Sequence, residues 1–476
     1  MNKKTDFSFL KGRHASPEGG RKCYGYVNYL LMRMYAEPHN KWNLDTLPAC
    51  GISKDHTVKW FFLIKDADIF NYYFDRFLAK PSLLKELEDF IEETSTSFLK
   101  DIENKNLEEL NKKQLAQLAS SYYTHFKTLA RAAGVLRWLD RSIVSRLKSI
   151  SEKYNLGSEG VSILSTSARN TFSTQERLAL LNLALKSKRL KEKKIEDEIK
   201  IIHDKFAWSV IGYYNEKPRT VQDYSNELEL LVNSKPEIIL REIEDKNQRE
   251  LAQRASILKS LNKEEKIIAN ISADATYLKD YYKSSISHMS YAMEPIFIEI
   301  SKRTKTNIDL VKDLFPEECA SLINENNMPK NINGRIKNHI CLASLDKYYI
   351  LTDKEAQEFE EKFIKIEGLD KKEFKGRVAC KGFVTGKAKV ILGTDDFHKF
   401  NKGDILVAAN TSPDFVPIMK KASAIIAEDG GITSHTSVVS REMGVPCIVG
   451  INNATKIFKD NELIEVDANK GVVKKL

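Results

Sequence analysis

The hydrophobic pattern is helical over a long central part of the chain, where no proline occurs from Ser82 to Lys217. Apolar residues recur there every three or four positions, which is typical of amphipathic helices. The pattern predicts helices over roughly Leu107–Leu129, Gly134–Tyr154, Gln175–Trp208, Val221–Leu261 and Glu264–Arg303. We therefore expect a large helical domain over residues 76–330.

Two shorter segments flank this domain. Residues 1–75 contain several prolines and glycines and an apolar run, Trp60–Ile64, so we expect an irregular segment in which this run could form a short strand. Residues 331–372 are expected to form a helical linker, because Thr352 and Asp353 can cap a helix over Lys354–Ile366.

The pattern changes after Glu373. Short apolar runs at Ile405–Val407, Ala424–Ile426 and Cys447–Val449 alternate with glycine-containing turns, which predicts strands and two short helices. The fold expected is therefore multidomain: a large, mostly α-helical N-terminal region followed by a C-terminal α/β domain over residues 373–476.

Composition indicates an ordinary globular protein, with 42% hydrophobic and 30% charged residues in 476. This length favours two or three domains. No apolar stretch approaches the roughly 20 residues of a membrane span, and the first residues have no apolar signal-peptide core. The six cysteines are scattered and form no CxxC pair. We expect reduced thiols, no metal site and a cytoplasmic location.

The formal charge of +9 raises the possibility of nucleic-acid binding. Its densest basic run, Lys186–Lys194, is followed directly by Glu196, Asp197 and Glu198. Mixed charges at helical spacing are typical of a solvated helix face. Nucleic-acid binding therefore stays a minor alternative, which would show as affinity that falls steeply with salt.

One short segment carries the strongest chemical signal. Gly430 and Gly431 permit a tight turn, Thr433 and Ser434 offer helix N-cap oxygens, and His435 follows in the first turn of an apolar helix. Free N–H groups and the helix dipole stabilise a phosphate dianion at such a position. The pattern predicts that His435 carries phosphate covalently. A structural histidine that caps a helix is the alternative.

The motifs around His435 form an ordered series. They are Val384–Ala388, Gly403–Val407, Thr411–Pro417, Gly430–His435, Gly444–Pro446, Asn453–Thr455, Val466–Asp467 and Gly471–Val473. This series resembles the phosphohistidine swivelling domain of PEP-utilising enzymes, a group that includes phosphoenolpyruvate synthase, pyruvate phosphate dikinase and rifampicin phosphotransferase. The resemblance implies that His435 accepts a phosphoryl group on an imidazole nitrogen, and that the domain swings between a donor site and an acceptor site.

Three other residues have two interpretations each. Asp414 follows the Thr-x-Pro-Asp pattern of the resembled domain and can support the loop near His435, or it simply forms a turn after proline. Arg441 lies about 240° round the helix from His435, which favours a surface or partner contact over a phosphate clamp. His288 is expected to serve in packing.

The resembled enzymes carry an ATP-grasp domain and, in some cases, a PEP/pyruvate barrel. The first 370 residues show no Gly-rich phosphate loop, and we expect both domains to be absent here. ATP or PEP with Mg²⁺ is then expected on a partner, such as a separate ATP-grasp protein. An acceptor could bind aromatic and Met-rich segments of the helical domain, although helix packing is the favoured interpretation of these: Phe206–Trp208, Tyr213–Tyr214 and Met289–Phe297.

Two functions therefore compete. The chain is a phosphotransferase component with His435 as carrier, or it is a non-catalytic regulatory or scaffold protein that uses the swivelling domain as an interaction module.

Overall fold

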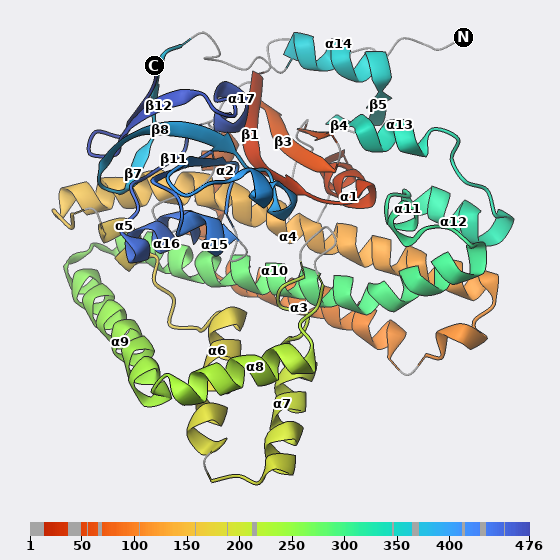
Figure 1. Cartoon of the computed structure of the whole chain (residues 1–476), viewed down its shortest axis with the longest axis horizontal. Coiled ribbons are helices and arrows are strands. Elements are labelled where there is room, and N and C mark those ends of the chain that lie inside the picture. Colours follow the sequence, from red (N-terminus) through yellow and green to blue (C-terminus); the bar gives the residue numbers. More distant parts are fainter. Residues whose placement is uncertain are drawn as a thin grey trace. The chain divides into compact units, whose positions relative to one another are not determined.

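The structure is a computed structural model that describes residues 14–36, 49–54, 56–64, 69–103, 105–157, 159–187, 189–211, 217–344, 347–363, 371–411, 415–428, 435–451 and 453–476. The chain separates into two compact units. Unit 1 combines Met1–Lys65 with Asn333–Leu476, and unit 2 is Asp66–Ile332. The colours of Figure 1 show the order of the elements along the chain. The helical residues of unit 2 are therefore inserted between two parts of the chain that fold together.

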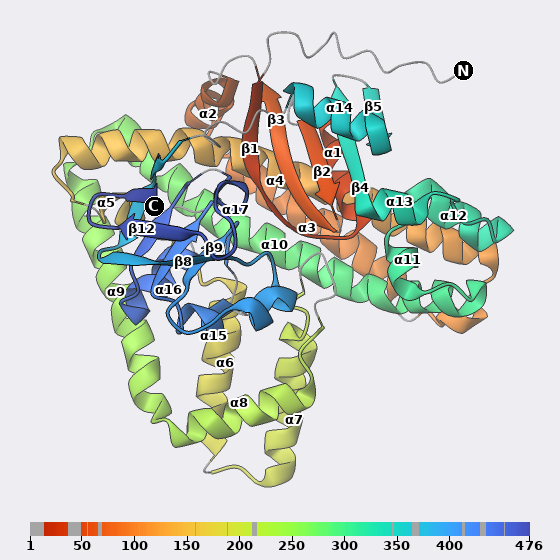
Figure 2. The same cartoon turned by 45° about the horizontal axis from the view of Figure 1, so that its top comes forward.

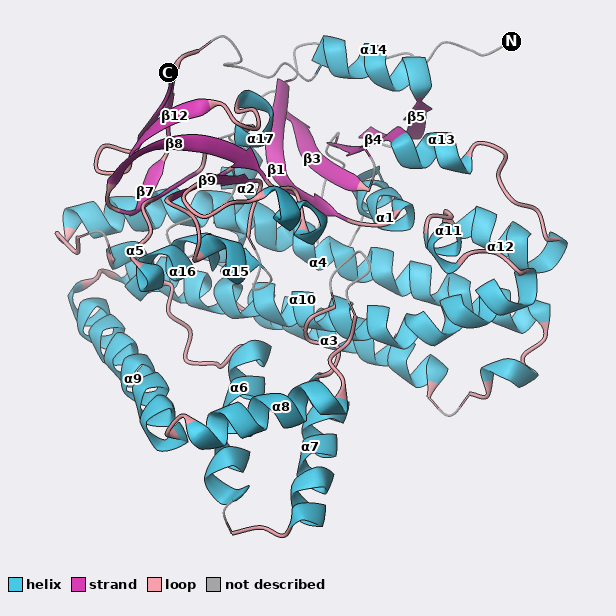
Figure 3. Cartoon of the chain, in the orientation of Figure 1, coloured by secondary structure: helices cyan, strands magenta, loops and turns pink. Residues whose placement is uncertain are grey.

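The described residues of unit 2 form helices and the loops between them (Figure 3). Its helices are α2 (Ile69–Ala79), α3 (Leu83–Ile102), α4 (Lys112–Lys153), α5 (Gly160–Leu164), α6 (Phe172–Ser187), α7 (Glu192–Phe206), α8 (Val221–Asn233), α9 (Pro236–Ser260), α10 (Lys263–Thr304), α11 (Ile308–Lys312) and α12 (Pro316–Glu325). The two longest, α4 and α10, pack against each other and against α3. In the described part of the chain, no helix has the length and apolar character that a membrane crossing requires.

Helix α4 joins most of two stretches that the sequence pattern kept apart, Leu107–Leu129 and Gly134–Tyr154, and Leu107–Glu109 form a separate 3-10 helix before it. The intervening residues 130–133 are three alanines and an arginine, which are strong helix formers. Conversely, the predicted stretch Val221–Leu261 divides into α8 and α9 at Pro236, which occupies the first turn of α9.

Unit 1 contains an antiparallel five-stranded sheet with the order β1-β3-β2-β4-β5 (Figure 2). Its strands are β1 (His14–Lys22), β2 (Ala49–Lys54), β3 (Thr57–Ile64), β4 (Asn338–Ser344) and β5 (Lys347–Thr352). Strand β2 pairs with β4 from Ala49 opposite Ala343 to Lys54 opposite Asn338. This pairing joins the segment that precedes the helical insertion to the segment that follows it.

Helices cover both faces of this five-stranded sheet. On one face, α14 (Asp353–Phe363) packs its Ala356 and Phe359 against Cys50, Ile52, Ile340, Leu342 and Leu351. On the other face, Asn28 of α1 (Gly25–Ala36) donates to the carbonyl of Gly51 at 3.1 Å and accepts from the indole N–H of Trp60 at 3.2 Å. Nδ1 of His339 lies 2.8 Å from the carbonyl of Arg335 and donates to it, so Nε2 accepts from Asn28 at 3.2 Å.

The prediction of a helical linker over residues 331–372 is wrong for 338–352, which form β4 and β5. These strands are rich in Ile, Leu and Tyr, and their alternate residues pack into the core with α14. Helices α13 (Ile332–Lys337) and α14 flank them. The expectation of an irregular segment over residues 1–75 is also wrong where these residues are described, because they form β1, α1, β2 and β3. The apolar run Trp60–Ile64 lies in β3, which pairs with β1 on one side and with β2 on the other.

The second sheet of unit 1 has eight strands in the order β6-β13-β12-β8-β9-β10-β11-β7. They are β6 (Glu373–Lys375), β7 (Arg377–Cys380), β8 (Phe383–Val390), β9 (Ile405–Ala408), β10 (Ala424–Ala427), β11 (Cys447–Val449), β12 (Leu463–Asp467) and β13 (Val472–Lys475). Strands β8, β9, β10 and β11 are parallel neighbours, and the remaining pairs are antiparallel. The α/β domain predicted at the C-terminal end is therefore present.

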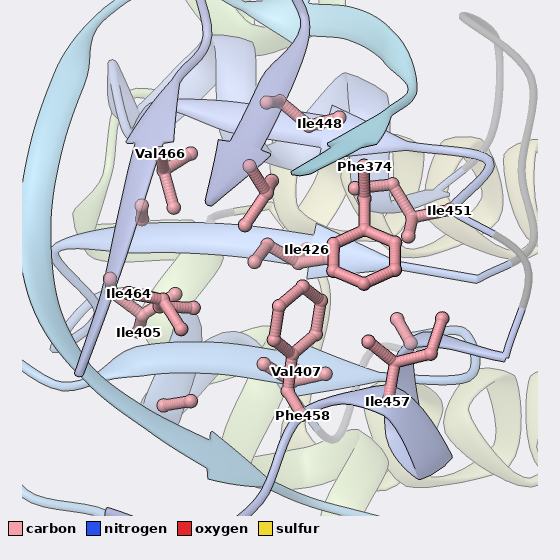
Figure 4. Close-up of a cluster of buried hydrophobic side chains, with 14 of the residues drawn as sticks. Phe374, Ile405, Val407, Ile426, Ile448, Ile451, Ile457, Phe458, Ile464 and Val466 are labelled. Atoms are coloured by element: carbon pink, nitrogen blue, oxygen red, sulfur yellow. The ribbon is translucent and has the colours of Figure 1, made fainter. Parts of the chain in front are cut away.

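The central strands of this second sheet are buried on both faces. Ala424 and Ile426 of β10 point into one cluster with Phe374, Phe458 and Val466 (Figure 4). Ile425 and Ala427 point into the opposite cluster, which includes residues of α15 (Val416–Met419) and α16 (His435–Met443). Burial on both faces explains why β9, β10 and β11 appear in the sequence as continuous apolar runs.

Replacing Gly51 by alanine is expected to destabilise the five-stranded sheet. The new Cβ would lie 1.8 Å from Oδ1 of Asn28 and 2.9 Å from Cδ1 of Trp60, and Asn28 cannot move without breaking its buried hydrogen bonds. Such overpacking costs about 1–3 kcal/mol. Hydrogen exchange of the β2 and β3 amides, measured by mass spectrometry, should accelerate about tenfold or more. The double variant with Asn28→Ala and Gly51→Ala should lose less free energy of unfolding than the sum of the losses in the two single variants. Strictly additive effects would contradict the clash.

Candidate functional site

The candidate site lies where β10 leads toward α16. Strand β10 ends at Ala427, Glu428 follows, and α16 begins at His435. Four predicted site residues, Gly430, Gly431, Thr433 and Ser434, lie outside the described residues, as does Asp414. Of His435 the structure describes the backbone, which starts the helix as the sequence predicted.

Two buried hydroxyls connect the first turn of α16 to the end of β9. Thr411 follows β9, Thr436 is the second residue of α16, and their Oγ1 atoms are 2.9 Å apart. Parallel strands β9 and β10 end at the same edge of the sheet, and the amide of Glu428 donates to the carbonyl of Ala408 at 3.0 Å. The start of α16 is therefore fixed at the carboxyl edge of these strands.

The body of α16 is anchored in the domain core. Ser437 and Ser440 are fully buried, and the Ser440 hydroxyl donates to the carbonyl of Ser437 at 3.2 Å. The helix stops at Gly444, whose φ of +65° is left-handed, and the amide of Val445 donates to the carbonyl of Ser440 at 3.0 Å. Arg441 is exposed on this helix. These contacts fix the body of α16 in the domain and thereby fix the position of its N-terminus.

Sequence reasoning missed the acidic residue at this edge. The carboxylate of Glu428 accepts hydrogen bonds from the amide of Thr455 at 2.7 Å and also from the Thr455 hydroxyl. Thr455 is in α17 (Ala454–Ile457). The same carboxylate accepts from Nζ of Lys59, a residue of β3, at 2.9 and 3.0 Å. The only sequence signal for Glu428 is its place at the end of an apolar run before two glycines, and Lys59 has no local signal.

Several cysteines of unit 1 are unsuited to chemistry at this site. Burial raises the pKa of the Cys447 thiol to about 12, and it also raises the pKa of Cys341 to about 12. These groups are neutral near pH 7 and act as small apolar side chains. Among the described residues, no group of three or more His, Cys, Asp and Glu side chains is placed to hold a metal ion.

The aromatic segments of unit 2 lie in packed positions. Phe206, Trp208, Met289, Met293 and Phe297 are almost fully buried, which favours helix packing over an acceptor pocket. The ring of His288 stacks on Trp208 with centroids 4.8 Å apart, and burial lowers its pKa. Tyr213 and Tyr214 lie outside the described residues.

Comparison with known proteins identifies the C-terminal domain. Residues 400–471 match the family described as PEP-utilising enzyme, mobile domain. The chain is 32% identical over 222 residues to "Probable phosphoenolpyruvate synthase" of Archaeoglobus fulgidus, covering 44% of this chain and 29% of that protein. It is 42% identical over 124 residues to "Phosphoenolpyruvate synthase" of Pyrococcus furiosus, covering 26% of this chain and 14% of that protein.

The chain therefore spans 29% or less of the length of these two relatives. Among solved structures, holo aconitase X of Thermococcus kodakaraensis is 20% identical, covers 22% of this chain and 98% of that chain, and has a TM-score of 0.17, too low to bear on the fold. The family match spans β9, β10, β11, β12 and α16, the helix that begins at His435. The C-terminal part of the chain is a mobile domain of the PEP-utilising enzyme type.

Proposed function

We propose that the chain is a phosphotransferase component that carries a phosphoryl group on His435 between a donor and an acceptor. The observation that carries the proposal is that residues 400–471 match the mobile domain of PEP-utilising enzymes and contain His435 at the first position of α16. A helix N-terminus offers free amide groups and the positive end of the helix dipole to an anion. The hydroxyl pair of Thr411 and Thr436 holds this turn in place.

The proposed reaction has two in-line steps. An imidazole nitrogen of neutral His435 attacks the phosphorus of the donor, and an N–P bond forms while the P–O bond to the leaving group breaks. An oxygen of the acceptor then attacks the same phosphorus and loses its proton, and the N–P electron pair returns to the ring. Neutral imidazole is available near pH 7, because its reference pKa is about 6.5.

The residues before His435 are proposed to support the phosphoryl group. Gly430 and Gly431 would let the backbone approach it closely, and Thr433 and Ser434 would donate hydrogen bonds to it or cap the helix. Asp414 is proposed to support the neighbouring loop. These assignments rest on residue types and order in the sequence.

The donor is proposed to be PEP, or ATP bound by a separate ATP-grasp protein. PEP is suggested by the name phosphoenolpyruvate synthase that the similar proteins carry. In either case Mg²⁺ would accompany the phosphates on the partner, since it prefers phosphate and carboxylate oxygens. The acceptor would be bound by unit 2 or by a further partner.

Phosphoryl transfer to His435 is testable with radiolabelled donors. The purified chain is incubated with labelled PEP, or with ATP labelled at the β or γ position together with a candidate ATP-grasp protein. We expect protein-bound label that is acid-labile and base-stable, and that His435→Ala abolishes.

His398→Ala is the matched control, because His398 is an exposed histidine of the same domain. It should label like the unchanged chain. If the folded chain takes up no label from any donor, the mobile domain serves as a non-catalytic interaction module. Equal label on the His435→Ala variant would place the chemistry elsewhere.

Replacing Thr411 by valine should slow labelling of His435 without unfolding the domain. The change keeps the side-chain shape but removes the partner of the buried Thr436 hydroxyl, at a cost of about 1–3 kcal/mol. If that loss acts on the position of α16, the rate should fall about tenfold or more. The variant Thr411→Val with Thr436→Val removes both hydroxyls and should recover part of the rate. An unchanged rate for Thr411→Val would show that this contact does not position the helix.

A further inference from the structure

Within the described part of unit 1, an ion pair connects the two sheets. Nζ of Lys59, on β3 of the five-stranded sheet, lies 3.0 Å from Oε1 and 2.9 Å from Oε2 of Glu428, at the end of β10 in the mobile domain. The same Nζ donates to Oγ1 of Thr455 at 2.9 Å. The side chains of Lys59 and Glu428 are only 15% and 10% exposed. A pair so poorly hydrated depends on both partners, because either charge alone would stay desolvated.

The hydrophobic clusters of the two sheets are separate. One cluster belongs to the five-stranded sheet and α14, and two belong to the eight-stranded sheet and its helices. Each sheet thus has its own core, and the contact through Lys59 is polar. Polar contacts of this kind are typical of interfaces that form and separate, in contrast to permanent apolar interfaces.

Further charges gather around this contact. Lys54, at the end of β2, binds Glu360 of α14 with its Nζ 2.9 Å from the carboxylate. Lys456, next to Thr455 in α17, has a pKa below the usual lysine value, because it is buried and because Lys59 and Lys54 are close, while Glu360 and Glu428 act in the opposite sense. Lys54 and Lys59 therefore each bind one carboxylate, and Lys456 lies close to both lysines.

We infer that the hairpin formed by β2 and β3 is a docking surface for the mobile domain, and that Lys59 is the positioning residue that holds the domain there through Glu428. The occupant of this surface is the mobile domain of the same chain. Glu428 is seven residues before His435, so the hairpin meets the domain at the edge where the site lies. The contact itself does not depend on phosphoryl transfer. Its role in directing the carrier rests on the proposed function.

If Lys59 holds the mobile domain, the position of that domain depends on the ion pair of Lys59 and Glu428. Spin labels are attached to two exposed positions, Glu355→Cys on α14 and Lys387→Cys on β8. Cys380→Ser removes the half-buried native cysteine. The distance between the two labels is measured by pulsed electron resonance. The unchanged pair should give one narrow distribution. Lys59→Glu should add a second, displaced population, and Lys59→Glu with Glu428→Lys should restore the narrow one. A narrow, unshifted distribution for Lys59→Glu would overturn the inference.

Lys402→Glu is the matched control, because Lys402 is an exposed lysine of the mobile domain and takes no part in the charge group around Lys59 and Glu428. It should leave the distance distribution narrow. If Lys59→Glu does not fold, Lys59→Met is used in its place, because it keeps the aliphatic part of the side chain and removes the charge. It should displace the mobile domain in the same way.

A second readout is the pKa of Lys456, measured by the pH dependence of its acylation. Lys59→Met should raise this pKa toward the usual lysine value, because a nearby positive charge and part of the burial are lost together. An unchanged pKa would contradict the contact between the sheets. The docking and the carrier role can fail separately. If His435 takes up label but Lys59→Glu leaves the distance distribution unaltered, the docking alone is refuted. If Lys59→Glu with Glu428→Lys restores the narrow distribution but the chain takes up no label, the carrier role alone is refuted.

Discussion

The burial of β9, β10 and β11 on both faces is the constraint on which the site depends. Alternate residues of β10 enter two different clusters, so the strand cannot shift by one residue without exchanging its two faces. The register in turn fixes where the strand ends, and Glu428 and Thr411 leave the sheet at the same edge. Helix α16 then starts at this edge with His435. A nucleophile that must meet a phosphorus atom in line needs such a fixed support.

The pairing of β2 with β4 is the second constraint. It brings residues 49–54 beside residues 338–343, and it allows the whole of unit 2 to be an insertion. The hairpin that carries Lys54 and Lys59 is thereby built into the same unit as the mobile domain. Under the proposed function, separation of the mobile domain at the Lys59–Glu428 contact would leave the hydrophobic clusters of both sheets intact.

Sequence reasoning succeeded where the determining interactions are local. The apolar periodicity of the long helices is a property of neighbouring residues, and so are the continuous apolar runs that form β9, β10 and β11. It failed for β4 and β5, because β4 pairs with β2, which lies far away in the sequence, and β5 in turn pairs with β4. The ion pair of Lys59 and Glu428, 369 residues apart, likewise has no local signature. The buried support of the candidate site was therefore not predictable from the sequence, and the role of His435 as the nucleophile stays a prediction.

The central claim is that His435 bears a phosphoryl group during turnover, and ³¹P NMR tests it most directly. The folded chain is mixed with PEP, or with ATP and an ATP-grasp partner, and separated from small molecules before the spectrum is recorded. The account predicts a protein-bound phosphorus resonance of an N-linked phosphoryl group that acid removes and that an excess of the true acceptor discharges. A spectrum with no protein-bound phosphorus under either donor condition would contradict it.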